Sequence, residues 1–135
     1  MNNDVIATFS LDGGKKYEVI ECNYGFSQNY DSSNKPTATA SINIINLAIK
    51  VTEDIELVDW MITKLAAKKG EIVIKLTESK FRKIIFTHGY CVNYNERFDN
   101  YSGTSFLLNI DILVKDIEIE GNGSVSHNSD LENRS

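Results

Sequence analysis

The last third of the sequence alternates apolar and polar residues over a long run. From Phe106 to Val114 every second residue is apolar, and the run TSFLLNIDILVKDIEI continues to Ile119 after one change of phase. A period of two is typical of a β-strand that buries one face. The phase slips before Ile117 and also at Ile44–Ile45, which indicates β-bulges or a sharp bend. With similar alternation elsewhere, the sequence predicts about six strands, the others at about residues 5–11, 20–26, 42–51, 72–76 and 83–98.

One segment between the third and fourth strands has helical spacing instead. In TEDIELVDWMITKLAAKKG the apolar residues recur every three or four positions, which predicts a helix at about residues 53–69. Thr52 is the expected N-cap and Gly70 the expected stop. Trp60 falls outside the apolar arc of this helix. We interpret it either as the rim of the packed face or as a subunit contact, since tryptophan is enriched at interfaces.

The length of the chain limits how these elements can be arranged. Its 135 residues suit one compact domain. Long strands with one apolar face favour a mainly β fold, a small curved antiparallel barrel or sandwich of about six strands with one inserted α-helix. We expect this domain over residues 1–119. Residues 120–135 are polar, rich in Gly, Ser and Asn, and without periodicity, so they predict a flexible C-terminal tail.

Composition argues against several classes of function. The formal net charge is −5 and no cluster of Lys and Arg is longer than a pair, so no nucleic-acid partner is expected. No apolar run approaches the ~18 residues of a membrane-spanning helix, so no membrane insertion is expected. The first residues lack a basic start followed by an apolar run, so no signal peptide is expected. The two cysteines are expected to be free thiols.

The stretch FTHGYCVNYNERF, residues 86–98, contains the best candidate for a catalytic pair. His88 and Cys91 have the types of a base and a nucleophile. On a regular strand their odd separation places them on opposite faces, whereas a base must lie about 3 Å from the proton it removes. Only a bulge at Gly89 would bring them together. The sequence therefore predicts no catalytic residue, no metal ligand and no cofactor-binding residue, and a protein that is not an enzyme.

Four segments carry a resemblance to a known family: KYEVIECNYGFSQNYDSSNKPTA, ASINIINLAIKVTEDIELVDWMI, GEIVIKL with FRKIIFTHGYCVNYNERFD, and TSFLLNIDILVKDIEI. Taken in order, they resemble the tube protein of the bacterial type VI secretion system, the haemolysin-coregulated protein or TssD family. The family usually has Gly-Arg before the proline of a polar loop, where this chain has Asn34-Lys35, which keeps a positive charge but loses the bidentate guanidinium. The specificity lies in the order and spacing of the segments, which cover about residues 5–119.

The resemblance implies a tail-tube-like barrel with one flanking helix, assembled as a homohexameric ring. Rings would stack into an inner tube that a contractile sheath propels and that delivers effectors. The implied partners are further copies of the chain and the sheath, spike and effector proteins of the machine. The implied location is the bacterial cytoplasm, followed by secretion without a signal peptide. The loop at residues 27–37 would reach the neighbouring ring, with contacts from Tyr30, Asp31, Lys35 and Pro36.

Other interpretations stay open at this point. One is a small β-barrel module that binds an apolar ligand in a cavity. Another is a tail-tube subunit of a phage-like or other contractile injection system. A third is a Cys-dependent enzyme, against which the faces of His88 and Cys91 argue.

Overall fold

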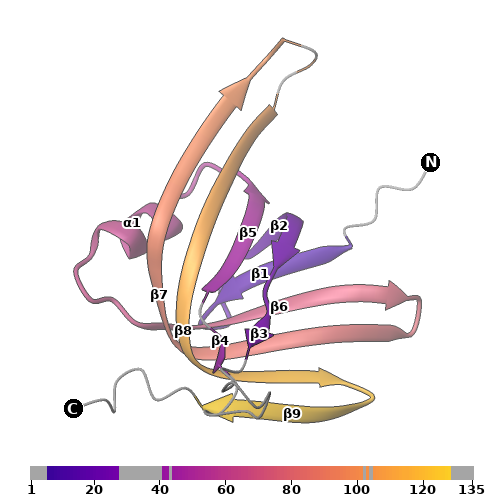
Figure 1. Cartoon of the computed structure of the whole chain (residues 1–135). Helices are drawn as coiled ribbons and strands as arrows, with labels where there is room; N and C mark the ends of the chain where they lie inside the picture. The colour runs from indigo at the N-terminus through magenta and orange to yellow at the C-terminus, as the bar shows by residue number, and fades with distance from the viewer. Residues whose placement is uncertain (1–5, 28–40, 43, 102, 104, 129–135) are drawn as a thin grey trace, which may run out of the picture.

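The computed structural model describes residues 6–27, 41–42, 44–101, 103 and 105–128, and within them it is built almost wholly of strands (Figure 1). The elements are β1 (Ala7–Leu11), β2 (Lys16–Asn23), β3 (Phe26–Ser27), β4 (Ser41–Ile42), β5 (Ile44–Lys50), α1 (Glu56–Ile62), β6 (Lys68–Thr77), β7 (Lys80–Asp99), β8 (Ser105–Gly121) and β9 (Gly123–Asn128).

The main sheet closes on itself. Its strand order is β5-β2-β1-β6-β7-β8-β9, and a further pairing of β5 with β8 joins six of these strands into an antiparallel barrel. Strand β9 continues the sheet beyond β8, while β3 and β4 form a separate two-stranded sheet. The predicted mainly β barrel with one inserted helix is confirmed.

The barrel interior is filled by side chains. Phe9 lies at its centre, with ring centroids 6.3 Å from Tyr17, 6.5 Å from Trp60 and 6.3 Å from Phe86. Apolar residues from the closing strands surround these rings, and all are buried. They include Ile45, Leu47, Ile49, Ile72, Ile84, Leu108, Ile110, Ile112 and Val114. The alternating apolar face predicted for the last long strand is therefore part of the core.

Strands β7 and β8 change their buried face at the same level. Along β8 the buried residues pass from Val114 to Ile117, and along β7 they pass from Phe86 to Gly89. The pairing between the two strands continues through this level without a shift, with Phe86 opposite Ile117 and Gly89 opposite Val114. The phase slip before Ile117 therefore comes from a bend of the two-stranded ribbon, one of the two predicted explanations.

His88 lies at the bend. Its φ of 53° is in the left-handed region, and the pairing of β6 with β7 shifts at this level, between Lys68 and Gly70. Figure 1 shows both long strands curving sharply near the start of β6. The bend lets one pair of strands serve two walls of the barrel.

The predicted bulge at Ile44–Ile45 is wrong. Strand β5 pairs with β8 in one unbroken register from Ile44 to Lys50. The shift lies instead in β2, between Val19 and Glu21. The chain belongs to different sheets on the two sides of residue 43, since β4 pairs with β3 and β5 joins the barrel. A change of sheet produces the same slip in the sequence pattern as a bulge.

Two glycines make room for one core ring. A Cβ atom built on Gly70 would lie 2.3 Å from Cζ of Phe86, and one on Gly89 would lie 2.4 Å from Cε1 of the same ring. The Phe86 ring therefore lies directly on the backbone of β6 and β7 at the bend. Gly70, expected as a helix stop, is a strand residue that admits this ring.

The helix is much shorter than predicted. It spans Glu56–Ile62 rather than 53–69 and ends at Thr63, whose N–H donates to the carbonyl of Asp59 at 3.0 Å. Thr52 is not the N-cap, since the cap residue is Ile55 and makes no side-chain cap bond. Residues from Lys68 onward are held in β6 by pairing with β1 and β7, so tertiary pairing outweighs their helical propensity.

The expected flexible tail begins with a strand. Residues 123–128 form β9 and pair with β8 from Asp116 to Gly121, after a turn in which Gly123 has φ 111°. Backbone hydrogen bonds order a polar segment that has no apolar periodicity. The sheet thus extends past the predicted domain boundary at residue 119, and residues 129–135 lie outside the described part of the chain.

A polar cluster joins the first hairpin to the start of α1. The buried hydroxyl of Tyr17 lies 2.8 Å from Oδ1 of Asp54 and 2.7 Å from Oε1 of Glu56. Lys15 Nζ lies 2.7 Å from Oδ2 of Asp54, and this contact lowers the pKa of that carboxyl to about 2. Burial and the two carboxylates raise the pKa of Tyr17. The cluster fixes the helix against the barrel.

Candidate assembly surface

The loop residues predicted to contact a neighbouring ring lie outside the described residues. They are Tyr30, Asp31, Lys35 and Pro36. Their role stays a prediction.

The structure corrects both interpretations of Trp60. Its side chain is 1% exposed, it stacks with Phe9, and its indole Nε1 donates to the carbonyl of Ala66 at 2.9 Å. It therefore belongs to the core of its own subunit. The predicted apolar arc placed it wrongly because the helical spacing was read across residues that are not helical.

His88 and Cys91 show no nucleophile–base arrangement. The bend at His88 interrupts the regular alternation that predicts opposite faces for the two residues. Each of the two side chains nevertheless contacts a residue other than its expected partner. His88 Nδ1 lies 3.2 Å from Oδ2 of Asp116, and Cys91 Sγ donates to the carbonyl of Asn93 at 3.5 Å. Burial, with the nearby charge of Asp111, raises the pKa of the Cys91 thiol to about 11. A catalytic thiolate needs the opposite shift.

Among the described residues, no group of three or more His, Cys, Asp or Glu could hold a metal ion. Within the same ranges, no helix is long and apolar enough to cross a membrane. Burial raises the pKa of the Cys22 thiol to about 11 as well, and both cysteines are free.

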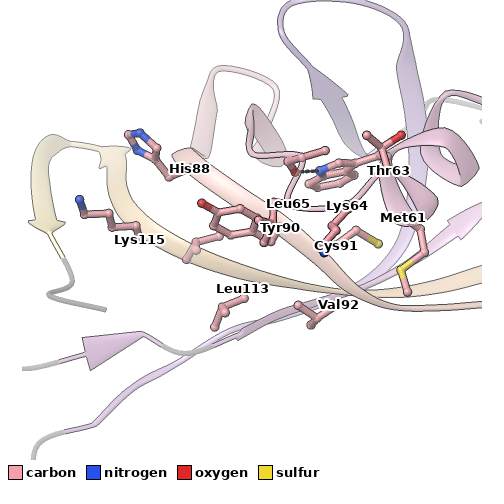
Figure 2. A pocket seen from close by; sticks show the side chains of 13 residues that line it. Met61, Thr63, Lys64, Leu65, His88, Tyr90, Cys91, Val92, Leu113 and Lys115 are labelled. Carbon is pink, nitrogen blue, oxygen red and sulfur yellow. Dashed lines mark hydrogen bonds between the residues drawn. The ribbon is translucent and has the colours of Figure 1, made fainter. Parts of the chain in front are cut away.

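An apolar groove of about 510 Å³ lies between the α1–β6 connection and the outer side of β7 and β8 (Figure 2). We call it the α1 groove. Figure 2 shows His88 and Lys115 at one end and Met61 at the other. Leu65, with a φ of 56°, is 80% exposed at its margin. The apolar side chains that line it include Trp60, Met61, Leu65, Ala66, Tyr90, Val92, Leu113 and Val114.

A second apolar surface lies on the free end of β7 and β8. These strands continue beyond the barrel as a two-stranded arm, which points away from the other strands in Figure 1. We call the end of this ribbon, residues 95–99 and 105–109, the aromatic arm. Its inner part still pairs with β5, from Lys50 opposite Leu107 to Ala48 opposite Asn109. Phe98 stands opposite Phe106, and their rings meet edge to face at 5.9 Å. Phe98 is 59% exposed and Phe106 is 42% exposed.

Sequence reasoning assigned no role to the aromatic arm. The alternation of Phe106, Leu108 and Ile110 predicts one buried face, but burial begins only at Leu108 and Phe106 is exposed. One signal of the arm is present in the sequence. The alternating pattern of the last strand is longer than the strands that a small barrel usually contains.

The sequence from residue 3 to residue 129 matches the family described as Hemolysin coregulated protein Hcp (TssD). The chain belongs to this family. The resemblance noted in the sequence is therefore confirmed, and it extends past residue 119 to include β9. Curated protein sequences give no match.

Solved structures of haemolysin-coregulated proteins share the fold. Hcp1 from Flavobacterium johnsoniae is 26% identical, with a TM-score of 0.76 over 90% of this chain and 99% of that one. A protein described as a type VI secretion system effector from Yersinia pestis is 13% identical, with a TM-score of 0.69 over 93% and 99%. Secreted protein Hcp3 from Pseudomonas aeruginosa is 12% identical, with a TM-score of 0.63 over 96% and 99%. At these last two identities the likeness concerns the fold alone.

Membership of the haemolysin-coregulated protein family supports a type VI secretion tube protein and agrees with a structural rather than an enzymatic role. The relevant surfaces are then those that could meet other proteins. Two such surfaces in the described residues are the α1 groove and the aromatic arm.

Proposed function

We propose that the protein is a tube subunit of a type VI secretion system. Six copies form a ring, rings stack into a hollow tube, and a contractile sheath drives the tube outward with its effectors. The family match over residues 3–129 carries the proposal, and the closed barrel with one flanking helix supports it.

The distribution of apolar surface supports self-assembly. The core is already complete within one chain, yet Phe98, Phe106 and Leu65 remain largely exposed. Exposed apolar side chains that gather in patches are typical of protein interfaces. The patches lie on different elements, as a head-to-tail contact requires, and such contacts close into a ring when their rotation permits.

The loop at residues 27–37 is proposed to contact the next ring. Its candidate residues include one cation, one anion and one aromatic side chain, a composition suited to a polar contact between stacked rings. Lys35 would act as a point charge where the family usually has arginine. The proposed residues are Tyr30, Asp31, Lys35 and Pro36.

The proposal also places the protein in the bacterial cytoplasm before it leaves through the machine. Its partners there would be the sheath, spike and effector proteins. Export by a dedicated machine would not require a signal peptide.

Light scattering and electron microscopy of the purified protein test the proposal. We expect particles with about six times the mass of the 15.2 kDa chain, seen as rings with a central hole. A Lys35→Ala, Pro36→Ala variant should still form rings but stack less. A protein that stays monomeric at high concentration, with no rings in the images, would refute the proposal.

A further inference from the structure

We propose that the aromatic arm of one subunit inserts into the α1 groove of a second copy. The inference rests on the proposed function and specifies which two surfaces meet. Phe98 and Phe106 would fill the groove between the α1–β6 connection and β7 of the neighbour.

The aromatic arm presents core-type side chains that its own chain leaves uncovered. By two-residue alternation Phe106 lies on the same strand face as Leu108 and Ile110, which are buried in the barrel. Phe98 stands opposite Phe106 and shares that face. The buried face of the barrel therefore continues outward along the arm, where the described residues of the same chain leave Phe98 59% exposed and Phe106 42% exposed.

The α1 groove offers a matching recess. Its volume of about 510 Å³ falls within the ~300–1,000 Å³ typical of sites that enclose a compact apolar group. Tyr90, Val92 and Leu113 form its floor on the outer side of the barrel, and the connection after α1 forms its wall. The edge-to-face contact of Phe98 and Phe106 restricts both rings before any partner binds, so the pair is a preorganised apolar group.

Charge also favours this pairing. The groove is lined by two cationic side chains, Lys64 and Lys115, and none of its lining residues is a carboxylate. The arm carries two carboxylates, Glu96 and Asp99, against one guanidinium at Arg97. In a chain with net charge −5, a cationic groove is an uncommon local feature that suits an acidic partner.

The arm cannot fill the groove of its own chain. Val92, in the groove, and Phe98, on the arm, belong to the same extended strand β7. Six strand residues hold these positions about 20 Å apart at ~3.3 Å each. The occupant must therefore come from another copy, and the contact is head-to-tail rather than symmetric.

A designed cysteine tests this contact, because Cys91 lines the groove. In a Cys22→Ser background, Phe98→Cys supplies the second thiol on the arm. If the arm occupies the groove, mild oxidation of assembled protein should give disulfide-linked dimers and longer ladders. Because the contact makes the local concentration of the two thiols high, we expect linkage at least about tenfold faster than between unpaired surfaces.

Two controls define the result. Val125→Cys in the same background places a thiol on β9 at a similarly exposed position, 68% against 59%, and should link slowly. Adding Cys91→Ser to Phe98→Cys should abolish the ladder. A Phe98→Ser, Phe106→Ser double variant should stay folded by circular dichroism yet assemble at least about tenfold more weakly, since it loses the apolar insert.

The outcomes separate this contact from the function on which it rests. Rings that form normally, with Phe98→Cys linking no faster than Val125→Cys, would overturn the contact and leave the proposed function intact. A wild-type protein that forms no rings would overturn both. Linkage that depends on Cys91 and on assembly supports the contact.

Discussion

Two phenylalanines of strand β7 differ in how far the rest of the chain buries them. Phe86 is fully buried, stacks with Phe9 at 6.3 Å and lies against the backbones of Gly70 and Gly89. Phe98 is 59% exposed and meets only the edge of Phe106 among the aromatic contacts of the described residues. The strand supplies similar side chains at both ends, and closure of the barrel decides which end becomes core.

The end of strand β5 marks the boundary between the two regions. Strand β5 pairs with β8 as far as Lys50 opposite Leu107, and Val51 N–H donates to the carbonyl of Phe106 at 3.1 Å. Beyond that point, within the described residues, β7 and β8 pair only with each other. A two-stranded ribbon has little area to bury, so its apolar side chains stay available to another molecule.

The largest expected difference in stability is between Phe86→Ala and Phe98→Ala. Phe86→Ala should lower the free energy of unfolding by about 3–5 kcal/mol, because it leaves a cavity at the barrel centre. Phe98→Ala should change it by at most about 1 kcal/mol, because the side chain is mostly in solvent. Urea denaturation of the dissociated protein measures both. Equal losses would show that the arm belongs to the cooperative core.

Adding a methyl group where the Phe86 ring contacts the backbone should lower the free energy of unfolding by somewhat less than Phe86→Ala does. Gly89→Ala places a Cβ 2.4 Å from the ring and should destabilise the fold by about 1–3 kcal/mol, since the core must shift. Gly25→Ala is the matched control, because a Cβ there meets nothing within 4 Å. Denaturation midpoints of the two variants give the comparison. In a Phe86→Leu background the cost of Gly89→Ala should shrink, and an unchanged cost would contradict the steric account.

The strands could be predicted from the sequence because their signal is local. Alternation at 106–114 marks the buried face of β8 whatever the rest of the chain does. The closure of the barrel, the bend at His88 and the exposure of Phe98 depend on which strands meet. Alternation shows which side chains share a face, but it carries no information on whether anything covers that face.

For the helix, the local pattern in the sequence predicts too much rather than too little. Its spacing continued through Leu65 and Ala66, so propensity alone predicted a longer element. The pairing of Lys68 with Gly89 and of Gly70 with Leu11 converts the end of that segment into β6. Trp60 was misplaced for the same reason. Strand β9 was missed because backbone pairing orders it without an apolar pattern.

A smaller effect is expected at the cluster that fixes α1 to the barrel. Asp54 accepts contacts from Lys15 and Tyr17 and has a pKa of about 2, below the usual value of about 3.9. A carboxyl whose pKa falls on folding stabilises the fold above about pH 4, and this contribution is lost as the pH falls through about 2. Asp54→Asn should therefore cost about 1 kcal/mol at neutral pH, a figure reduced by solvent screening.

Denaturation of Asp54→Asn and of the wild type at several acidic pH values checks the direction in which the stabilising contribution of Asp54 changes with pH. The difference between the two should narrow as the pH falls from about 4 to about 2. Lys15→Met should reproduce most of the loss at neutral pH, because it removes the nearest cation to Asp54. A difference that stays constant over this range would show that the carboxylate charge is not what matters. No comparable cluster of described residues anchors the aromatic arm.

The smallest effect is expected at Cys91, where the barrel wall becomes the floor of the α1 groove. Serine can donate to the same Asn93 carbonyl, so Cys91→Ser should change the free energy of unfolding by less than about 1 kcal/mol. Assembly, measured by light scattering, should be unchanged, since burial raises the pKa of the thiol to about 11 and leaves little thiolate to do chemistry. Cys22→Ser, a second half-buried thiol with a raised pKa, is the matched control. If Cys91→Ser alone abolished a measurable activity while rings still formed, this part of β7 would have a chemical role, and the division of the strand into core and contact surface would be incomplete.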